Sequence, residues 1–178
     1  MQTQHRLSQI VDGLVDLFSV LKDDTTTSGF PIKVPVVIKK YQHWSALEVA
    51  ERRLNRQVFP ALMLNFGEGG NRITGGTQAE FASLGQTEDH LEMALIGIVK
   101  ETQYATDDLT DQVANLIFSV ERLINGTHDL GVDGVERVTI EEVPQTSAGR
   151  AAAVSGEEMD IIVFPITVVH VYRASTFA

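Results

Sequence analysis

The glycine-rich stretch at residues 67–85 is the first candidate for chemistry, because it holds six of the chain's 14 glycines. Gly70 and Gly75 have the G-x-x-x-x-G spacing of a phosphate-binding loop, but the position that needs a lysine is Gly76. Without that lysine the loop lacks its contact to the β- and γ-phosphates, and no clear helix follows whose N-terminus would hold a phosphate. We therefore expect a flexible interaction loop or a weak hairpin here in preference to a nucleotide site.

The histidines and the paired carboxylates offer no convergent set of groups. No two histidines have the H-E-x-x-H spacing of a zinc site, and two-residue matches such as His90 with Glu92 are weak. Adjacent acids such as Glu141 and Glu142 point to opposite faces of a strand, so they cannot share one acid–base step. Cysteine is absent, and so is a G-x-S-x-G elbow. The sequence predicts a protein that is not an enzyme and that holds no metal or cofactor.

Length and charge narrow the class of protein. The chain has 178 residues, which predicts a single domain over 1–178, and its formal charge of −10 disfavours broad binding to a phosphate backbone. Residues 1–22 read as an amphipathic helix interrupted by Asp12 and Asp16, so they do not fit a signal peptide, and no apolar run is long enough to span a bilayer. We expect a soluble protein, made in a cytoplasm, with no membrane partner.

The charge is unevenly distributed along the chain. Residues 1–60 carry eight basic and six acidic side chains, whereas residues 61–178 carry six and eighteen, which gives net charges of +2 and −12. The only basic cluster consists of Lys39, Lys40, Arg52, Arg53 and Arg56. Nucleic-acid binding is one interpretation of this cluster. A head-to-tail protein contact is the favoured one, because such a contact repeated by rotation closes a ring.

Hydrophobic periodicity sets the expected elements. Apolar residues at helical spacing predict helices over 3–22, 44–56 and 109–125. Ser45 and Glu48 have the spacing of a capping box at the start of the second helix, and Asp107-Asp108 opens the third. Apolar runs predict strands over 34–39, 58–66, 90–100, 135–143 and 159–173. Pro31 and Pro35 favour an edge position for the first strand, and Pro165 implies an edge position, a bulge or a bend in the last one.

The order of these elements predicts an α+β fold. The last two strands follow each other without a helix between them, so we expect antiparallel neighbours. The predicted architecture is a single mixed, largely antiparallel sheet with helices packed on one face. The segments 67–85 and 144–157, rich in small residues, are predicted to be flexible interaction loops.

This order resembles that of the phage tail terminators, the proteins that cap a finished tail tube and join it to the head. The similar parts are the opening helix around Leu7–Leu21, the strand from Phe59 to Leu64, and the strand ending at Val99. The helix 109–125 and the strand pair 135–143 and 161–173 complete the order. The resemblance covers most of the chain and rests on order and periodicity, without an invariant motif.

The resemblance implies a structural virion protein of the tail or neck, assembled in the host cytoplasm. It implies a homo-oligomeric ring, a homohexamer in that family, whose partners are the tail tube protein and a head-completion or connector protein. DNA would pass through the lumen without sequence-specific binding. The residues predicted to lie at contacts between subunits or between rings are Lys39, Lys40, Arg52, Arg53, Arg56, Glu68, Arg72, Ile73, Arg150, Glu157 and Glu158.

Three alternatives stay open at this point. The chain can be another neck, connector or tail tube protein of the virion, which would polymerise where a terminator stops at one ring. It can be a small cytosolic ligand-binding or enzymatic domain with a closed pocket. It can also be an adaptor whose helix 1–22 enters the groove of a partner.

Overall fold

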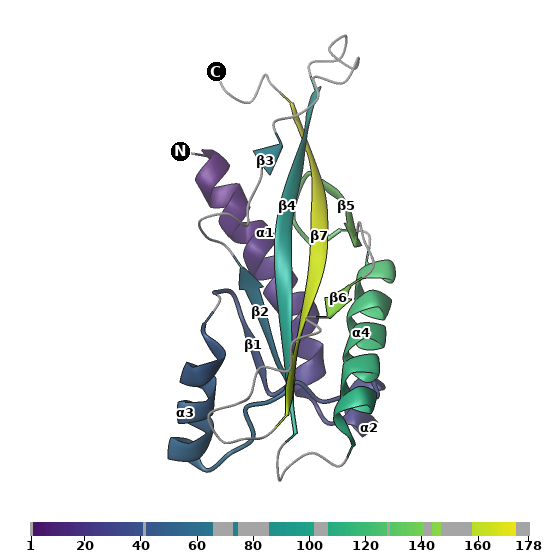
Figure 1. Cartoon of the computed structure of the whole chain (residues 1–178). Helices are drawn as coiled ribbons and strands as arrows, with labels where there is room; N and C mark the ends of the chain where they lie inside the picture. Colours follow the sequence, from purple (N-terminus) through teal and green to yellow (C-terminus); the bar gives the residue numbers. More distant parts are fainter. Residues whose placement is uncertain are drawn as a thin grey trace.

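The α+β fold expected from the sequence is confirmed by a computed structural model, which describes residues 2–40, 42–65, 73–74, 86–101, 107–127, 129–140, 144–146 and 158–173. The main sheet has the strand order β1-β2-β4-β7-β5, with β3 paired to β4 and β6 to β7 (Figure 1). Only the β1–β2 pair is parallel among the pairs described, so the sheet is mixed and largely antiparallel as predicted. The elements are α1 Gln2–Ser19, η1 Val20–Lys22, α2 Thr25–Ser28, β1 Val36–Ile38, α3 Trp44–Leu54, β2 Ala61–Asn65, β3 Ile73–Thr74, β4 Gln86–Lys100, α4 Leu109–Asn125, β5 Val135–Ile140, β6 Gln145–Thr146 and β7 Met159–Arg173.

The long strands β4 and β7 form the centre of the sheet. They pair antiparallel along their whole length, from Gln86 opposite Arg173 to Lys100 opposite Met159. Alternate residues of each strand therefore line two different faces. β4 also pairs with β2, and β7 also pairs with β5. The backbone pairings therefore run without a break across the sheet.

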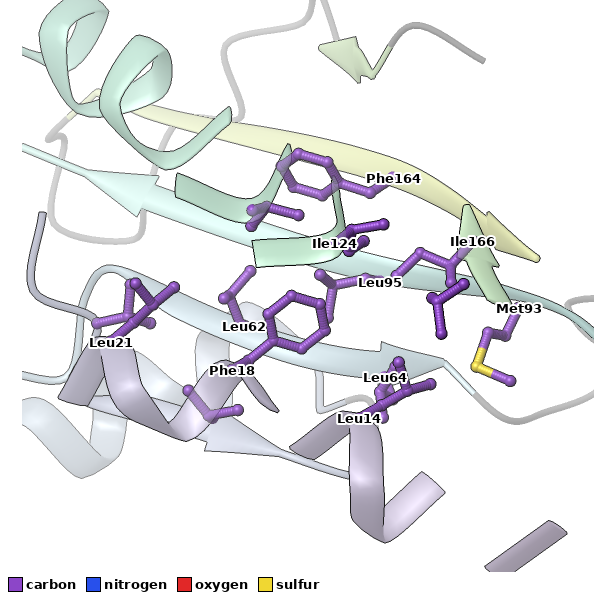
Figure 2. Packing of buried hydrophobic residues seen from close by; sticks show 14 of the residues in the cluster. Leu14, Phe18, Leu21, Leu62, Leu64, Met93, Leu95, Ile124, Phe164 and Ile166 are labelled. Carbon is purple, nitrogen blue, oxygen red and sulfur yellow. The ribbon is translucent and has the colours of Figure 1, made fainter. Parts of the chain in front are cut away.

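The first face of the sheet is covered by α1 and α4. Leu14, Phe18 and Leu21 on α1 and η1 are fully buried against this face. Figure 2 shows these side chains beside residues of β2, β4, α4 and β7, namely Leu62, Leu64, Met93, Leu95, Ile124, Phe164 and Ile166. The helix predicted over 3–22 is confirmed. Its apolar stripe is the side of the helix that packs in this core.

The position of α4 depends on a glycine of β4. A Cβ atom added to Gly97 would lie 2.8 Å from Leu116 Cδ2 and 3.3 Å from Phe164 Cε2. The missing side chain thus makes room for the buried Leu116 of α4. The boundaries predicted for this helix, 109–125, are those that the structure has.

The third helix lies on the other face, which corrects the expectation that all helices share one. Leu47 of α3 packs in a second apolar cluster with Ala61, Met63 and Ile98, which alternate with the residues of the first face. Figure 1 shows α3 and α4 on opposite sides of the β4–β7 pair. The N-cap of α3 is also not Ser45: the ring of His43 accepts the hydrogen bond from the Ser45 backbone N–H.

Pro165 lies in an interior strand, so the edge position considered for it is wrong. β7 stands between β4 on one side and β5 and β6 on the other. On the latter side Ile140 pairs with Ile166 and Gln145 pairs with Val163, so Pro165 falls between the two described pairings. A proline costs little where no ladder partner needs its N–H. The edge position predicted for the first strand is confirmed, because β1 ends the strand order.

The two predicted interaction loops lie mostly outside the described residues. Within 67–85 the structure describes Ile73 and Thr74, which pair antiparallel with Leu91 and His90. Within 144–157 it describes residues 144–146, where β6 pairs with β7. The backbone pairing of β3 agrees with the weak-hairpin interpretation of the glycine-rich stretch.

Candidate assembly surfaces

The inner side of α3 carries a buried group of three charges. Lys100 at the end of β4 places its Nζ 3.0 Å from Glu48 Oε1 and 3.5 Å from Glu51 Oε2. The Lys100 side chain is 3% exposed and that of Glu48 is 2% exposed. Lys100 lies on the same face of β4 as Ile98, so its ammonium group points at the helix that covers this face.

Two neighbouring residues help to hold this group in place. Glu51 Oε1 accepts a hydrogen bond from the backbone N–H of Val58 at 3.3 Å. The ammonium group of Lys100 also lies 5.4 Å from the centre of the Phe59 ring, within the range of a cation–π interaction. Burial of charges is tolerated when they are paired, and Lys100 is paired with both carboxylates. The ion group therefore fixes α3 on the sheet and fixes which side of α3 faces outward.

The outward side of α3 is basic as a consequence. Both acids between residues 44 and 56 point inward, so the exposed charges of this segment are Arg52, Arg53 and Arg56. Within the described residues none of these three arginines forms an ion pair. Val49, four residues before Arg53 on the same side of the helix, is 53% exposed. We call Val49, Arg52, Arg53 and Arg56 the α3 outer face. Leu54 is also exposed, but it lies on the side of the helix that carries Leu47 and Glu51.

The structure divides the basic cluster that the sequence suggested. Lys39 and Lys40 precede the N-terminus of α3, whereas the arginines lie at its C-terminal end. A helix of 11 residues advances about 16 Å, so the lysines and the arginines form separate groups. Lys39 also forms an ion pair at 2.9 Å with Asp12 of α1. Lys40 stays a predicted contact residue in a separate group, and the three arginines are the candidates at the C-terminal end of α3.

Exposed carboxylates lie at both ends of α4, which covers the opposite face of the sheet from α3: before the helix and in its first turn, and then from Asp129 into β5. Six carboxylates are exposed there against two exposed arginines, Arg122 and Arg137; the six are Asp107, Asp108, Asp111, Asp129, Asp133 and Glu136. Arg122 is occupied within the chain, since it lies 5.3 Å from the Phe30 ring and donates a hydrogen bond to the Gly29 carbonyl. A helix of 17 residues advances about 26 Å, so Asp107, Asp108 and Asp111 form one acidic group and the other three carboxylates form a second.

One carboxylate at the start of α4 caps the helix, whereas another is exposed on its first turn. Asp108 is the N-cap of α4, and its side chain accepts a hydrogen bond from the Asp111 backbone N–H at 2.8 Å. Asp111 lies in the first turn of the helix and is exposed. Two turns further along the same side of the helix, Phe118 is 52% exposed. We call Asp107, Asp111 and Phe118 the α4 acidic face.

The remaining predicted contact residues are scattered. Glu158 is exposed just before β7, and its carbonyl accepts a hydrogen bond from the Glu101 backbone N–H. Ile73 is placed in β3 by its backbone. Glu68, Arg72, Arg150 and Glu157 lie outside the described residues. Of the predicted contact residues, the structure brings together Arg52, Arg53 and Arg56.

Sequence reasoning missed Glu51, Lys100, Val49, Leu54 and Phe118. One signal for the buried ion group was present, because Lys100 continues the alternation of Ile96 and Ile98 on an apolar face. A charge on such a face requires a buried counter-charge. Glu48 was assigned to a capping box instead, and that assignment is wrong because His43 caps the helix.

Known protein families and curated proteins supply no relative of this chain. The sequence matches no known protein-family profile, and no curated protein shows significant similarity to it. In the part of the chain that the structure describes, no helix has the length and apolarity needed to cross a bilayer. The same residues include no group of three or more histidines, cysteines or carboxylates arranged to hold a metal ion.

Proposed function

We propose that this chain is a structural protein of a tailed-phage virion, a tail terminator that forms a ring. The ring caps the tail tube, stops its polymerisation and joins it to the head connector. Its role is non-enzymatic, and its partners are further copies of itself, the tail tube protein and a connector protein. The protein is assembled in the host cytoplasm and ends in the tail or neck of the particle.

The observation that carries the proposal is the separation of exposed charge between two outer helices. The α3 outer face is basic and the α4 acidic face is negative, and the two helices cover opposite faces of one sheet. They cannot neutralise each other within one chain. A contact between unlike surfaces is heterologous, and it forms a ring when its rotation closes.

The element order supports the same proposal. The N-terminal helix, the central strands, α4 and the final antiparallel strands occur in the order on which the resemblance to tail terminators rests. The mechanism would be steric. A ring stacked on the last ring of the tube covers the surface on which tube subunits add, and its other face is offered to the connector.

Two of the alternatives predict different behaviour. An adaptor that inserts its first helix into a partner needs a free apolar face, but the apolar face of α1 is part of the core. A tail tube protein would use the same head-to-tail chemistry within a ring and would then continue to stack. The number of stacked rings therefore separates a tube protein from a terminator.

Negative-stain electron microscopy of the purified protein tests the proposal, first alone and then after addition to polymerising tail tubes. We expect single rings with a central hole, and tubes whose growth stops when the protein is added. Open-ended tubes formed by the protein itself would mean that it is a tail tube protein and not a terminator. Rings that leave tube growth unchanged would overturn the capping role.

A further inference from the structure

We infer that the α3 outer face of one copy docks on the α4 acidic face of the next copy, and that this contact builds the ring. The inference rests on the proposed function for the ring itself and names the surfaces that form it. The occupant of the α3 outer face is thus a second copy of this chain.

The two surfaces lie at the same end of the sheet, as a side-by-side contact requires. The C-terminal end of α3 leads to Ala61, which pairs with Ile98 near the end of β4. The N-terminal end of α4 follows the same end of β4, just after Lys100. Figure 1 shows both helix ends at the lower end of the molecule, on opposite sides of β4 and β7. Copies placed side by side at one height would bring arginines to carboxylates.

Charge complementarity identifies the partner. Arg52 and Arg53 are exposed and without an ion pair within the described residues, and Asp107 and Asp111 are exposed at the start of α4. Each set suits the dipole of its own helix, because cations stabilise a C-terminus and anions an N-terminus. That effect does not account for the exposed apolar side chains beside both sets.

Val49 and Phe118 supply the centre of the contact. They are 53% and 52% exposed, and each lies on the same side of its helix as a charge of its face, Arg53 for Val49 and Asp111 for Phe118. An apolar centre with a charged rim is the usual anatomy of a protein interface. The aromatic ring of Phe118 is the expected anchor, and the charges set the orientation of the two copies.

Charge reversal on the full-length chain tests the inference, with mass measured by light scattering. The basic-face variant is Arg52→Glu with Arg53→Glu, and the acidic-face variant is Asp107→Lys with Asp111→Lys. Asp108 is left unchanged because it caps α4. Each variant alone is expected to weaken self-association about tenfold or more, since like charges then face each other. The control, Lys22→Glu, reverses an exposed lysine elsewhere and should assemble as the parent does.

The decisive sample is an equimolar mixture of the two variants. The reversed faces of the two variants carry opposite charges, so contacts between unlike variants can form again and the mixture is expected to recover assembly. Recovery also shows that both variants are folded. Loss of assembly in each variant without recovery in the mixture would overturn the inference, and so would unchanged assembly of either variant. A parent chain that stays monomeric would overturn it as well.

The result is separable from that for the proposed function. Rings with the expected response to charge reversal that do not stop tube growth would leave the interface standing and remove the terminator role. Rings that stop tube growth but assemble unchanged after charge reversal would support the terminator role and overturn the proposed interface. Phe118→Ser adds a test without a charge change, and it is expected to weaken association of the parent while leaving the thermal unfolding of the monomer nearly unchanged.

Discussion

At the scale of single residues, the buried ion group of Lys100, Glu48 and Glu51 decides how α3 is presented. Burying three charges carries a large desolvation penalty, and the net stabilisation from such a group is often small. Its effect on orientation is larger, since it turns both acids of α3 inward. The outer surface is basic because the inner surface holds both of the helix's carboxylates.

Replacing Lys100 tests this role. Lys100→Met leaves two buried carboxylates without the cation that faces them, so we expect a loss of about 3–5 kcal/mol in the free energy of unfolding. Urea denaturation followed by circular dichroism measures it. Combining Lys100→Met with Glu48→Gln and Glu51→Gln removes the charges together and should restore most of the loss, because the amide oxygen introduced by Glu51→Gln would still accept from the Val58 N–H. A loss below about 1 kcal/mol in the single variant would show that the group does not hold α3.

At the scale of elements, the N-cap of α4 can be tested separately from its charge. Asp108→Ala removes the hydrogen bond to the Asp111 N–H, and we expect a destabilisation of about 1 kcal/mol. Asp108→Asn keeps the cap while removing the charge and should cost far less. Thermal unfolding of both variants makes the comparison. Equal losses would mean that charge at the helix terminus matters more than the hydrogen bond.

The first helix offers a second test at this scale. Phe18 is fully buried, so Phe18→Ala is expected to destabilise the domain by about 3–5 kcal/mol. Asp16→Ala on the exposed side of the same helix is the matched control and should change stability little. Chemical denaturation separates the two. A Phe18→Ala protein as stable as the control would mean that the helix is an appendage, as the adaptor hypothesis requires.

The sequence predicted the elements well where a local pattern determines them. The apolar stripes of α1 and α4 repeat over several turns, and the final strand is a long apolar run, so their bounds were found closely. The face covered by α3 was not predictable, because a short amphipathic helix packs equally well on either side of a sheet. Pro165 is interior because β7 pairs with β4 on one side and with β5 and β6 on the other, which is a long-range property.

The candidate surfaces were only partly predictable for the same reason. Net charge along the chain pointed to the arginines of the α3 segment, and they are exposed. Only the tertiary contact of Glu48 and Glu51 with Lys100 shows that no exposed acid of this helix offsets them. The sequence does not indicate that Phe118 is exposed, because its neighbours Ile117 and Leu116 belong to the core and apolar residues occur all along this helix.

At the scale of the whole molecule, the charged rim predicts a salt-dependent assembly. The screening length is about 10 Å at 0.1 M salt and about 3 Å at 1 M, so raising salt weakens the contact between the two helices. We expect the midpoint concentration for assembly, measured by sedimentation, to rise with sodium chloride. Association should persist in part, because burial of Phe118 and Val49 does not depend on screening. Assembly that strengthens steadily with salt would show a purely apolar interface.

The mass of the purified chain in solution tests the central claim most directly. Light scattering on the main chromatographic peak at low salt should give one discrete assembly of about six copies of the 19.5 kDa chain, and images of that peak should show a ring. A discrete ring means that the contact between copies is one whose rotation closes. A monomer at every concentration, or a continuous series of masses, would contradict the account.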